Sequence, residues 1–319
     1  MVFNRLSRRT FLKRSGIAAA AIAMPPFQIT AEPAPAHPNA AILRGTLGLP
    51  TDTPLFGRAF ATHTAHAAPS TTAPLTETLP ADSVHAISAL SEDGAWYRLP
   101  VGYVQRDRLQ LILPYTPPPA LTEGTYGEVI APFSAIRQYC ATAAPILERL
   151  YFGMVVIVHE TLIDDYGMRW YSVSLVAGSP AGYGWLPAAH LAPYPLAGTA
   201  LAQPAAIIDR AQARLTLYDG GRKIGEAATY SWLSAPLEGI LRVVAPSGVV
   251  SGISYFRPSL MIVEGAGSLS IPVSGAYWHN RFGERGTSLE RERIELSTFA
   301  ARALYALVDG RGELPISVR

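Results

Sequence analysis

The sequence is poor in cysteine. Cys140 is the only cysteine among 319 residues, which excludes an internal disulfide and a cysteine-rich metal site. There is no Cys-x-x-Cys pair, no glycine-rich phosphate loop after a strand and no pair of histidines at metal-ligand spacing. We therefore expect no cofactor and no metal. Stability must come from packed cores, for which the 49% of hydrophobic residues supplies ample material.

A strong excess of one charge is also missing. The formal net charge is +2, but the first 36 residues hold five basic residues against one acidic residue. Residues 37–319 consequently carry 21 basic and 23 acidic residues. A nucleic-acid-binding protein needs a basic face, so this balance argues against nucleic acid as a partner.

Residues 1–36 carry the pattern of an export signal. The basic stretch Ser7–Lys13 precedes a mild apolar run, Gly16–Met24, which is shorter than the roughly 20 residues of a bilayer-spanning helix. Ala34–Ala36 then offers a cleavage site, and a basic amphipathic helix is the alternative interpretation. The stretch resembles the twin-arginine signal at its fixed positions Arg8, Arg9, Phe11 and Leu12. The resemblance implies export to the periplasm, cell wall or exterior, with membrane contact only through an uncleaved signal.

The middle of the chain contains an internal repeat. β-branched and aromatic runs, such as residues 155–158 and 170–173, lie between Gly, Pro and Asp turns and predict short strands. Four positions recur after 71 to 74 residues, and such a shared offset indicates two copies of one unit. The matched pairs are Pro74 and Pro145, Leu79 and Leu150, Val84 and Val155, and Trp96 and Trp170.

Each copy runs from a turn to a Trp-Tyr strand, then a Gly-Tyr-Val or Gly-Trp-Leu strand and a closing leucine. This order resembles bacterial SH3-like modules, small β-barrels that accompany cell-wall enzymes and bind wall peptides. The resemblance implies one module over 41–113 and another over 128–195, joined by a stiff, proline-rich linker over 114–127. The tryptophans of these copies either line a peptide groove or fill the cores, and we favour the cores. They are Trp96, Trp170 and Trp185.

The pattern changes at about residue 198. Strand-like segments on both sides of Asp219-Gly220-Gly221 predict a hairpin. Apolar residues share one helical face over Thr298–Val308, which predicts a closing helix.

The stretch Gly275–Asn280 closely matches a segment of the L,D-transpeptidase catalytic domain. Ala235–Gly239 resembles a Pro-Gly turn of that family, and Ile294–Ser297 resembles the segment after its cysteine. The resemblance covers 198–319, so we expect a mainly β protein: two small SH3-like barrels followed by a β-sandwich with a short C-terminal helix. It also implies peptidoglycan as a partner, with substrate-binding roles for Gly275, Tyr277, Trp278, His279 and Asn280.

The catalytic residues of that family are missing. Ser274 stands at the place of its first catalytic histidine. If the family's segment is aligned backward from Ile294, Arg291 stands at the second histidine and Arg293 at the nucleophilic cysteine. If it is aligned forward from Ser288, Arg291 stands at the cysteine. Arginine serves as neither nucleophile nor base. No intact catalytic set is therefore predicted.

Three functions remain open. We favour a catalytically inactive envelope protein that binds peptidoglycan or a wall partner, in which Arg291 or Arg293 either lies in a solvated charged run or holds a stem-peptide carboxylate. The second is an active transpeptidase or carboxypeptidase with an unusual nucleophile, Ser274 or Ser288, and His279 as its base. The third is an assembly factor without wall affinity.

Overall fold

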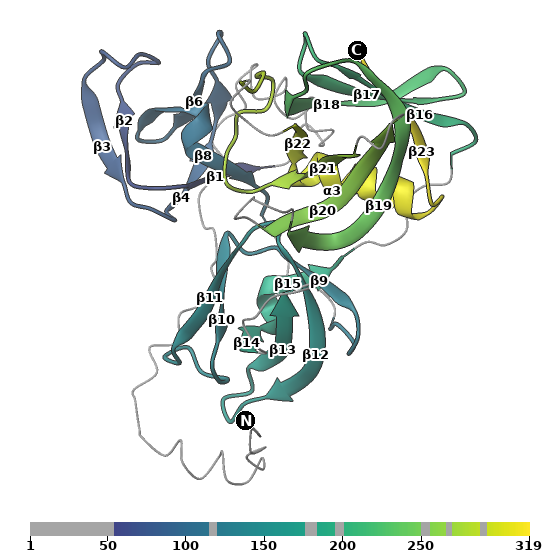
Figure 1. Ribbon diagram of the computed structural model, residues 1–319. Coiled ribbons are helices and arrows are strands. Elements are labelled where there is room, and N and C mark those ends of the chain that lie inside the picture. Colours follow the sequence, from purple (N-terminus) through teal and green to yellow (C-terminus); the bar gives the residue numbers. More distant parts are fainter. Residues whose placement is uncertain are drawn as a thin grey trace.

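The structure, a computed structural model, describes residues 54–114, 120–175, 184–194, 201–249, 256–265, 270–287 and 292–319. The export segment, Ser288 and Arg291 lie outside these residues. The described chain is mainly β and forms two small N-terminal domains and a larger C-terminal barrel (Figure 1). Within this part of the chain, no helix has the length and apolar character needed to cross a bilayer.

The first domain, residues 54–114, consists of eight short strands in two sheets. One sheet has the order β4-β1-β8 and the other β3-β2-β7-β6-β5. Their inward side chains, among them Leu79, Tyr97 and Val104, form one buried core. The elements are β1 (Leu55–Ala59), β2 (His63–His66), β3 (Leu75–Leu79), β4 (Val84–Ile87), β5 (Ala89–Leu90), β6 (Trp96–Leu99), β7 (Gly102–Gln105), the 3-10 helix η1 (Arg106–Arg108) and β8 (Leu109–Ile112).

The second domain, residues 120–194, has one seven-stranded sheet of order β11-β10-β14-β13-β12-β9-β15. Its fully buried Leu150 and Trp170 correspond to Leu79 and Trp96 in the first domain, and a 3-10 helix precedes the last strand of each domain. The sheet organisation differs between the two domains, so the internal repeat stays a prediction. The elements are β9 (Tyr126–Val129), β10 (Phe133–Arg137), β11 (Ile146–Tyr151), β12 (Val155–Ile163), β13 (Arg169–Leu175), β14 (Gly184–Pro187), η2 (Ala188–His190) and β15 (Leu191–Pro193).

The C-terminal domain is a closed barrel with the strand order β16-β17-β18-β22-β21-β20-β19-β23. The strands expected to form a sandwich thus form one sheet that closes on itself. Gly220 and Gly221 have φ of 55° and 80°, the left-handed values that a tight hairpin turn requires, so the predicted hairpin is confirmed. The strands are β16 (Pro204–Asp209), β17 (Arg214–Asp219), β18 (Arg222–Trp232), β19 (Leu237–Val249), β20 (Phe256–Gly265), β21 (Ser270–Ala276), β22 (Arg293–Ser297) and β23 (Leu314–Val318).

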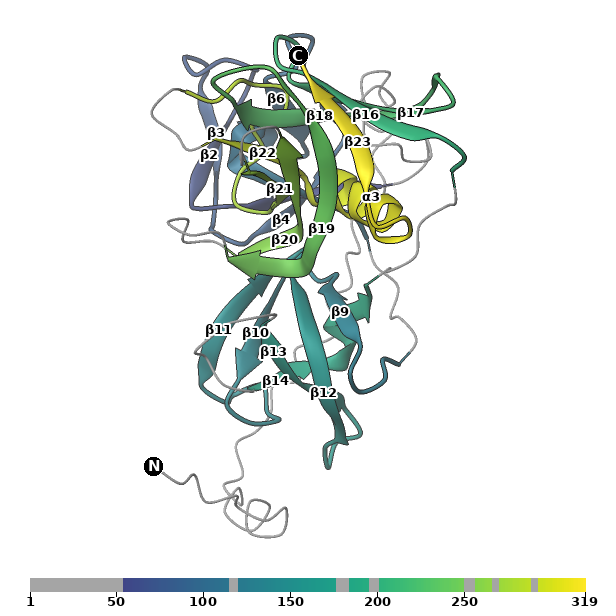
Figure 2. The same ribbon diagram turned by 45° about the vertical axis from the view of Figure 1, so that its right-hand side comes forward.

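The predicted closing helix is confirmed as α3 (Thr298–Asp309). Ser297 caps its first turn, because the Ser297 hydroxyl accepts a hydrogen bond from the Ala300 N–H at 3.2 Å. Its apolar face, which includes Leu304 and Val308, packs against β19 to β22 (Figure 2). The helix therefore completes the core of the barrel.

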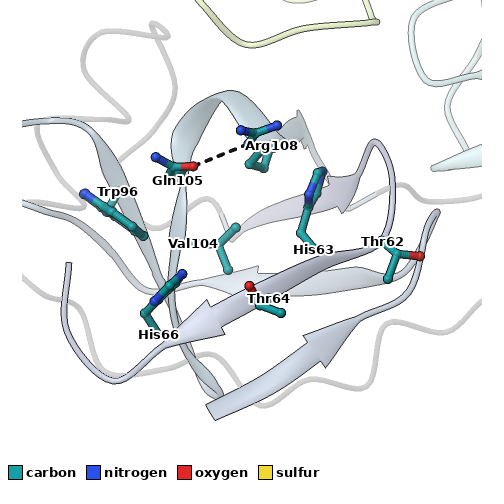
Figure 3. Close-up of a pocket in the computed structure, with 8 residues that line it drawn as sticks. All are labelled: Thr62, His63, Thr64, His66, Trp96, Val104, Gln105 and Arg108. Atoms are coloured by element: carbon teal, nitrogen blue, oxygen red, sulfur yellow. Dashed lines mark hydrogen bonds between the residues drawn. The ribbon is translucent and has the colours of Figure 1, made fainter. Parts of the chain in front are cut away.

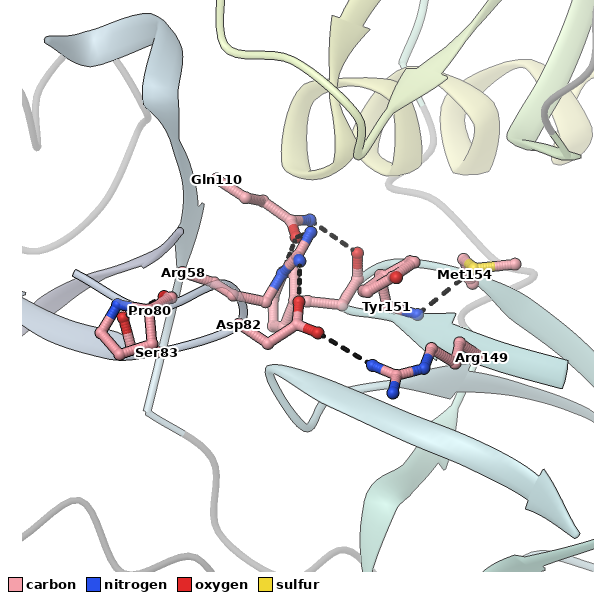
Figure 4. Close-up of polar contacts among 9 residues, drawn as sticks. Arg58, Pro80, Asp82, Ser83, Gln110, Arg149, Tyr151 and Met154 are labelled. Atoms are coloured by element: carbon pink, nitrogen blue, oxygen red, sulfur yellow. Dashed lines mark hydrogen bonds and ion pairs between the residues drawn. The ribbon is translucent and has the colours of Figure 1, made fainter. Parts of the chain in front are cut away.

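Buried polar contacts join the first two domains. Arg58 is 2% exposed, and its Nη1 lies 2.6 Å from Asp82 Oδ1. The other oxygen of Asp82 lies 3.1 Å from Nη1 of Arg149 in the second domain (Figure 4). Gln110 accepts from Arg58 and donates its Nε2 to the Phe152 carbonyl at 2.9 Å. The first two domains are thus held to each other by specific polar contacts.

The second domain is tied to the barrel in a similar way. Glu128 on β9 is 3% exposed and pairs with Arg302 on α3 at 2.6 Å. The hydroxyls of Tyr194 and Ser259 form a hydrogen bond of 2.8 Å. These contacts fix the second domain to the barrel, and the first domain lies beside the barrel (Figure 1).

Candidate functional site

Parallel pairing of β21 with β22 brings together the positions at which the resembling family has catalytic residues. Ser274 pairs in register with Glu295, and Arg293 is the first residue of β22. The Ser274 and Glu295 side chains are completely buried. Ser274 and Glu295 thus lie side by side on the face of β21 and β22 opposite to Val273 and Ile294, which belong to the barrel core, and Arg293 lies on the same face as Glu295.

Glu295 is the centre of a buried ionic cluster. Its Oε1 lies 3.0 Å from Arg257 Nη2 and 3.0 Å from Arg293 Nε. Its Oε2 lies 2.8 Å from His279 Nε2. Arg257 Nη1 also donates to the Ser274 hydroxyl at 2.9 Å. We call these five residues the Glu295 cluster.

The surrounding cations keep the Glu295 carboxylate ionised. Burial alone would raise the pKa of Glu295, because a charge in a low-dielectric interior is unfavourable. The hydrogen bond that His279 donates, together with the charges of Arg257 and Arg293, outweighs burial and lowers that pKa. Burial lowers the pKa of Arg257 while Glu295 opposes the shift. The cluster is thus a compensated set of buried charges.

Neither Ser274 nor His279 is arranged for nucleophilic catalysis. The Arg281 N–H donates to His279 Nδ1 at 3.1 Å, so Nδ1 carries a lone pair and Nε2 carries the proton donated to Glu295. Both ring nitrogens are occupied. Ser274, among the described residues, has the Arg257 guanidinium as its side-chain partner. Because guanidinium accepts no proton, the cluster contains no activated hydroxyl.

Residues predicted to bind substrate are partly built into the junction between domains. Tyr277 is 7% exposed, belongs to the second domain's core and stacks on Tyr151 with ring centroids 5.8 Å apart. Asn280 donates its Nδ2 to the Tyr97 hydroxyl at 2.8 Å and to the Leu109 carbonyl at 3.0 Å, both in the first domain. These two side chains bind the protein's own domains.

The neighbouring residues are equally enclosed. The Arg257 guanidinium lies 5.1 Å from the centre of the Trp278 ring, a cation–π contact, while Trp278 packs against the second-domain core. A side chain at Gly275 would approach Pro258 and Ala301 to within 3.1 and 3.3 Å. Glycine at this position therefore allows close packing against β20 and α3.

A pocket that sequence reasoning did not find lies in the first domain (Figure 3). Its volume is about 320 Å³, and we call it the first-domain pocket. Its lining residues come from the β2 region, β6, β7 and η1: Thr62, His63, Thr64, His66, Trp96, Val104, Gln105 and Arg108. Trp96 is the residue by which the sequence could have indicated this pocket, because its ring both packs in the core and lines the pocket wall. Trp170 of the second domain is instead wholly buried and donates to Asp164.

The pocket combines the Arg108 guanidinium with two histidine rings. His66 Nδ1 donates to the Ala73 carbonyl at 3.1 Å, which leaves Nε2 as an acceptor. Burial, and then the charge of Arg108, lower the pKa of His63, so this ring is neutral at pH 7. The His66 ring meets Trp96 edge-on, with centroids 5.4 Å apart. The pocket can bind a small group that carries a negative charge.

Cys140 does not resemble a catalytic thiol. Burial, and then the charge of Asp164, raise its pKa to about 12, so the thiol is neutral at physiological pH. It lies after β10 in the second domain. The described residues contain no group of three or more His, Cys, Asp or Glu side chains placed to hold a metal ion.

No protein-family model matches the sequence, and no curated protein matches it. The L,D-transpeptidase LdtMt1 in complex with imipenem is similar at 12% identity and a TM-score of 0.27, covering 58% of this chain and 78% of that chain. An L,D-transpeptidase from Mycobacterium smegmatis is similar at 17% identity and a TM-score of 0.30, covering 62% of this chain and 100% of that chain. TM-scores this low carry no inference about activity, which has to come from the side chains.

Proposed function

We propose that this protein is a non-catalytic component of the cell envelope, exported by the twin-arginine route, that binds peptidoglycan stem peptides or a partner at the wall. Export is supported by the Arg8-Arg9 motif and the apolar run that follows it. Wall binding is supported by the resemblance of the repeated domains to SH3-like modules.

The Glu295 cluster is the observation that carries the proposal. Acyl transfer at the former catalytic positions requires a thiolate or activated hydroxyl and a base. Arg293 supplies no lone pair, Ser274 is bound by Arg257, and His279 uses both nitrogens. An active enzyme with a serine nucleophile was the second function open from sequence, and no contact in this cluster favours it.

The first-domain pocket supplies a site of suitable chemistry for wall peptides. Stem peptides carry carboxylates, and the Arg108 guanidinium, 48% exposed, can bind one by charge-assisted hydrogen bonds. The Trp96 ring gives an apolar wall and His66 an acceptor for an amide N–H. A volume of about 320 Å³ suits the end of a stem peptide better than a whole stem.

The test uses the purified protein from Ala36 onward with wall fragments rich in tetrapeptide stems. We expect the protein to sediment with insoluble wall, and we expect mass spectrometry to show unchanged stems beside a working transpeptidase control. New cross-links or released D-alanine would overturn the non-catalytic assignment. Failure to sediment with the wall would leave the assembly-factor function as the better description.

Substitution Arg108→Gln locates the binding site. Loss of one exposed charge pair is worth about 0.2–1 kcal/mol, so wall binding should weaken by roughly 1.4- to 5-fold. Arg98→Gln makes the same chemical change at an exposed residue of β6 that does not line the pocket, and it should leave binding unchanged. Equal effects of both variants would point to non-specific attraction by charge.

A further inference from the structure

A second hollow lies where the first domain, the β17–β18 hairpin and the start of α3 meet. Its volume is about 680 Å³, within the range of roughly 300–1,000 Å³ that is typical of sites for small ligands. We call it the junction groove. Large apolar side chains from four elements line it, among them Leu111 of β8, Leu217 of β17, Ile224 of β18 and Phe299 of α3.

Most polar side chains in the junction groove already bind other protein groups. Gln110 is engaged through both its oxygen and its nitrogen, and Asn280 donates to the first domain. His279 uses both ring nitrogens, and the Ser297 hydroxyl caps α3. Few groups remain to recognise the amides of a peptide, and an unpaired buried amide is costly. The groove therefore suits a hydrocarbon better than a peptide backbone.

The groove also contains an excess of positive charge. Arg106 and Lys223 line it, with Glu226 as the lining carboxylate. That carboxylate is shared by Lys223 at 2.5 Å and Arg214 at 3.2 Å, so one negative charge faces two cations. Arg106 lies 3.8 Å from Glu284, a long separation for an ion pair between side chains that are 27% and 45% exposed. A bound anion would restore neutrality.

The hydrocarbon walls and the excess charge together define the ligand. We propose that the junction groove binds a free fatty acid, with its chain against Leu217 and Phe299 and its carboxylate near Arg106 and Lys223. The first turn of α3 lines the groove without an acidic residue, so it adds no repulsion. This site is separate from the first-domain pocket, and its test is independent of wall binding.

Titration calorimetry of the purified protein with dodecanoate tests the proposal. Dodecanoate should bind with one-to-one stoichiometry, whereas tetra-alanine and hexanoate, which carry the same carboxylate without a long chain, should bind at least tenfold more weakly. Absence of dodecanoate binding would overturn the proposal. So would tetra-alanine that binds as tightly as dodecanoate, or phosphatidylglycerol vesicles that bind while dodecanoate does not.

Two variants with matched controls place the ligand. Ala303 is exposed on α3 and lines the groove, so Ala303→Trp should fill it and weaken dodecanoate binding at least tenfold without disturbing the core. Val244→Trp, at a residue that is 52% exposed and does not line the groove, should bind normally. Lys223→Gln should weaken binding roughly 1.4- to 5-fold, and its neighbour Arg222→Gln should not. Unchanged binding by Ala303→Trp, with a native circular dichroism spectrum, would exclude this groove as the site.

Discussion

Substitution Glu295→Gln should strongly destabilise the protein. Gln has the shape of Glu, but it carries no charge and replaces one acceptor oxygen with a donor NH2 group. The new donor faces Arg257 or His279, both of which donate to Glu295 in the native cluster. Arg257, 1% exposed, would be left as a buried cation without its counter-ion. Breaking a buried pair in this way costs about 3–5 kcal/mol, a large part of a typical stability of about 5–15 kcal/mol.

Urea unfolding at pH 7, followed by circular dichroism, measures this loss. Glu264→Gln is the control, since Glu264 pairs with Arg242 at 3.0 Å but its side chain is 56% exposed, and it should lose under about 1 kcal/mol. Adding Arg257→Met to Glu295→Gln should recover part of the lost stability, because it removes the unpaired charge. The reasoning is refuted if Glu295→Gln costs no more than Glu264→Gln, or if the double variant is less stable than Glu295→Gln alone.

Two further predictions concern titrating groups. Burial, and then the charge of Arg137, lower the pKa of His190 to about 4, against an unfolded value of about 6.5. As pH falls, the unfolded state binds the proton before the folded state does, so the free energy of unfolding should fall by up to about 3 kcal/mol from pH 6.5 to 4 and no further below pH 4. Urea unfolding at several pH values should show that His190→Gln removes most of this pH dependence. A pH dependence that persists in the variant would come from another group. Because burial raises the pKa of Cys140 to about 12, iodoacetamide at pH 7.5 should alkylate it far more slowly in the native protein than in urea, and equal rates by mass spectrometry would contradict its burial.

Local signals allowed much of the fold to be predicted from the sequence. Asp219-Gly220-Gly221 specifies a hairpin through backbone conformations that glycine adopts freely. The apolar spacing of 298–308 specifies a helix whose observed end is Asp309, one residue later. Leu79 and Leu150, one of the pairs on which the predicted repeat rests, are both completely buried.

The Glu295 cluster was not predictable in the same way. Ser274 and Arg293 stood out because they align with catalytic residues of the family that the sequence resembles. That resemblance did not predict which side chains would surround them. Arg257 comes from β20 and reaches Glu295 only through the pairing of β20 with β21 and of β21 with β22. The partner of Arg293 is Glu295, two residues further along the same strand. Such contacts depend on long-range register, which a single sequence does not reveal.

The cluster and the domain junction together explain why introducing the side chains of the resembling family would not create a catalytic site. With Ser274→His and Arg293→Cys, the new imidazole would still face the Arg257 guanidinium, which disfavours the protonated form that acyl transfer requires. Glu295 would lose one of its two guanidinium partners while remaining buried. Tyr277 would also remain packed in the second-domain core. The contacts of the cluster, and not a single missing thiol, therefore stand against nucleophilic chemistry at these positions, where buried charges are compensated beside the junction of the domains.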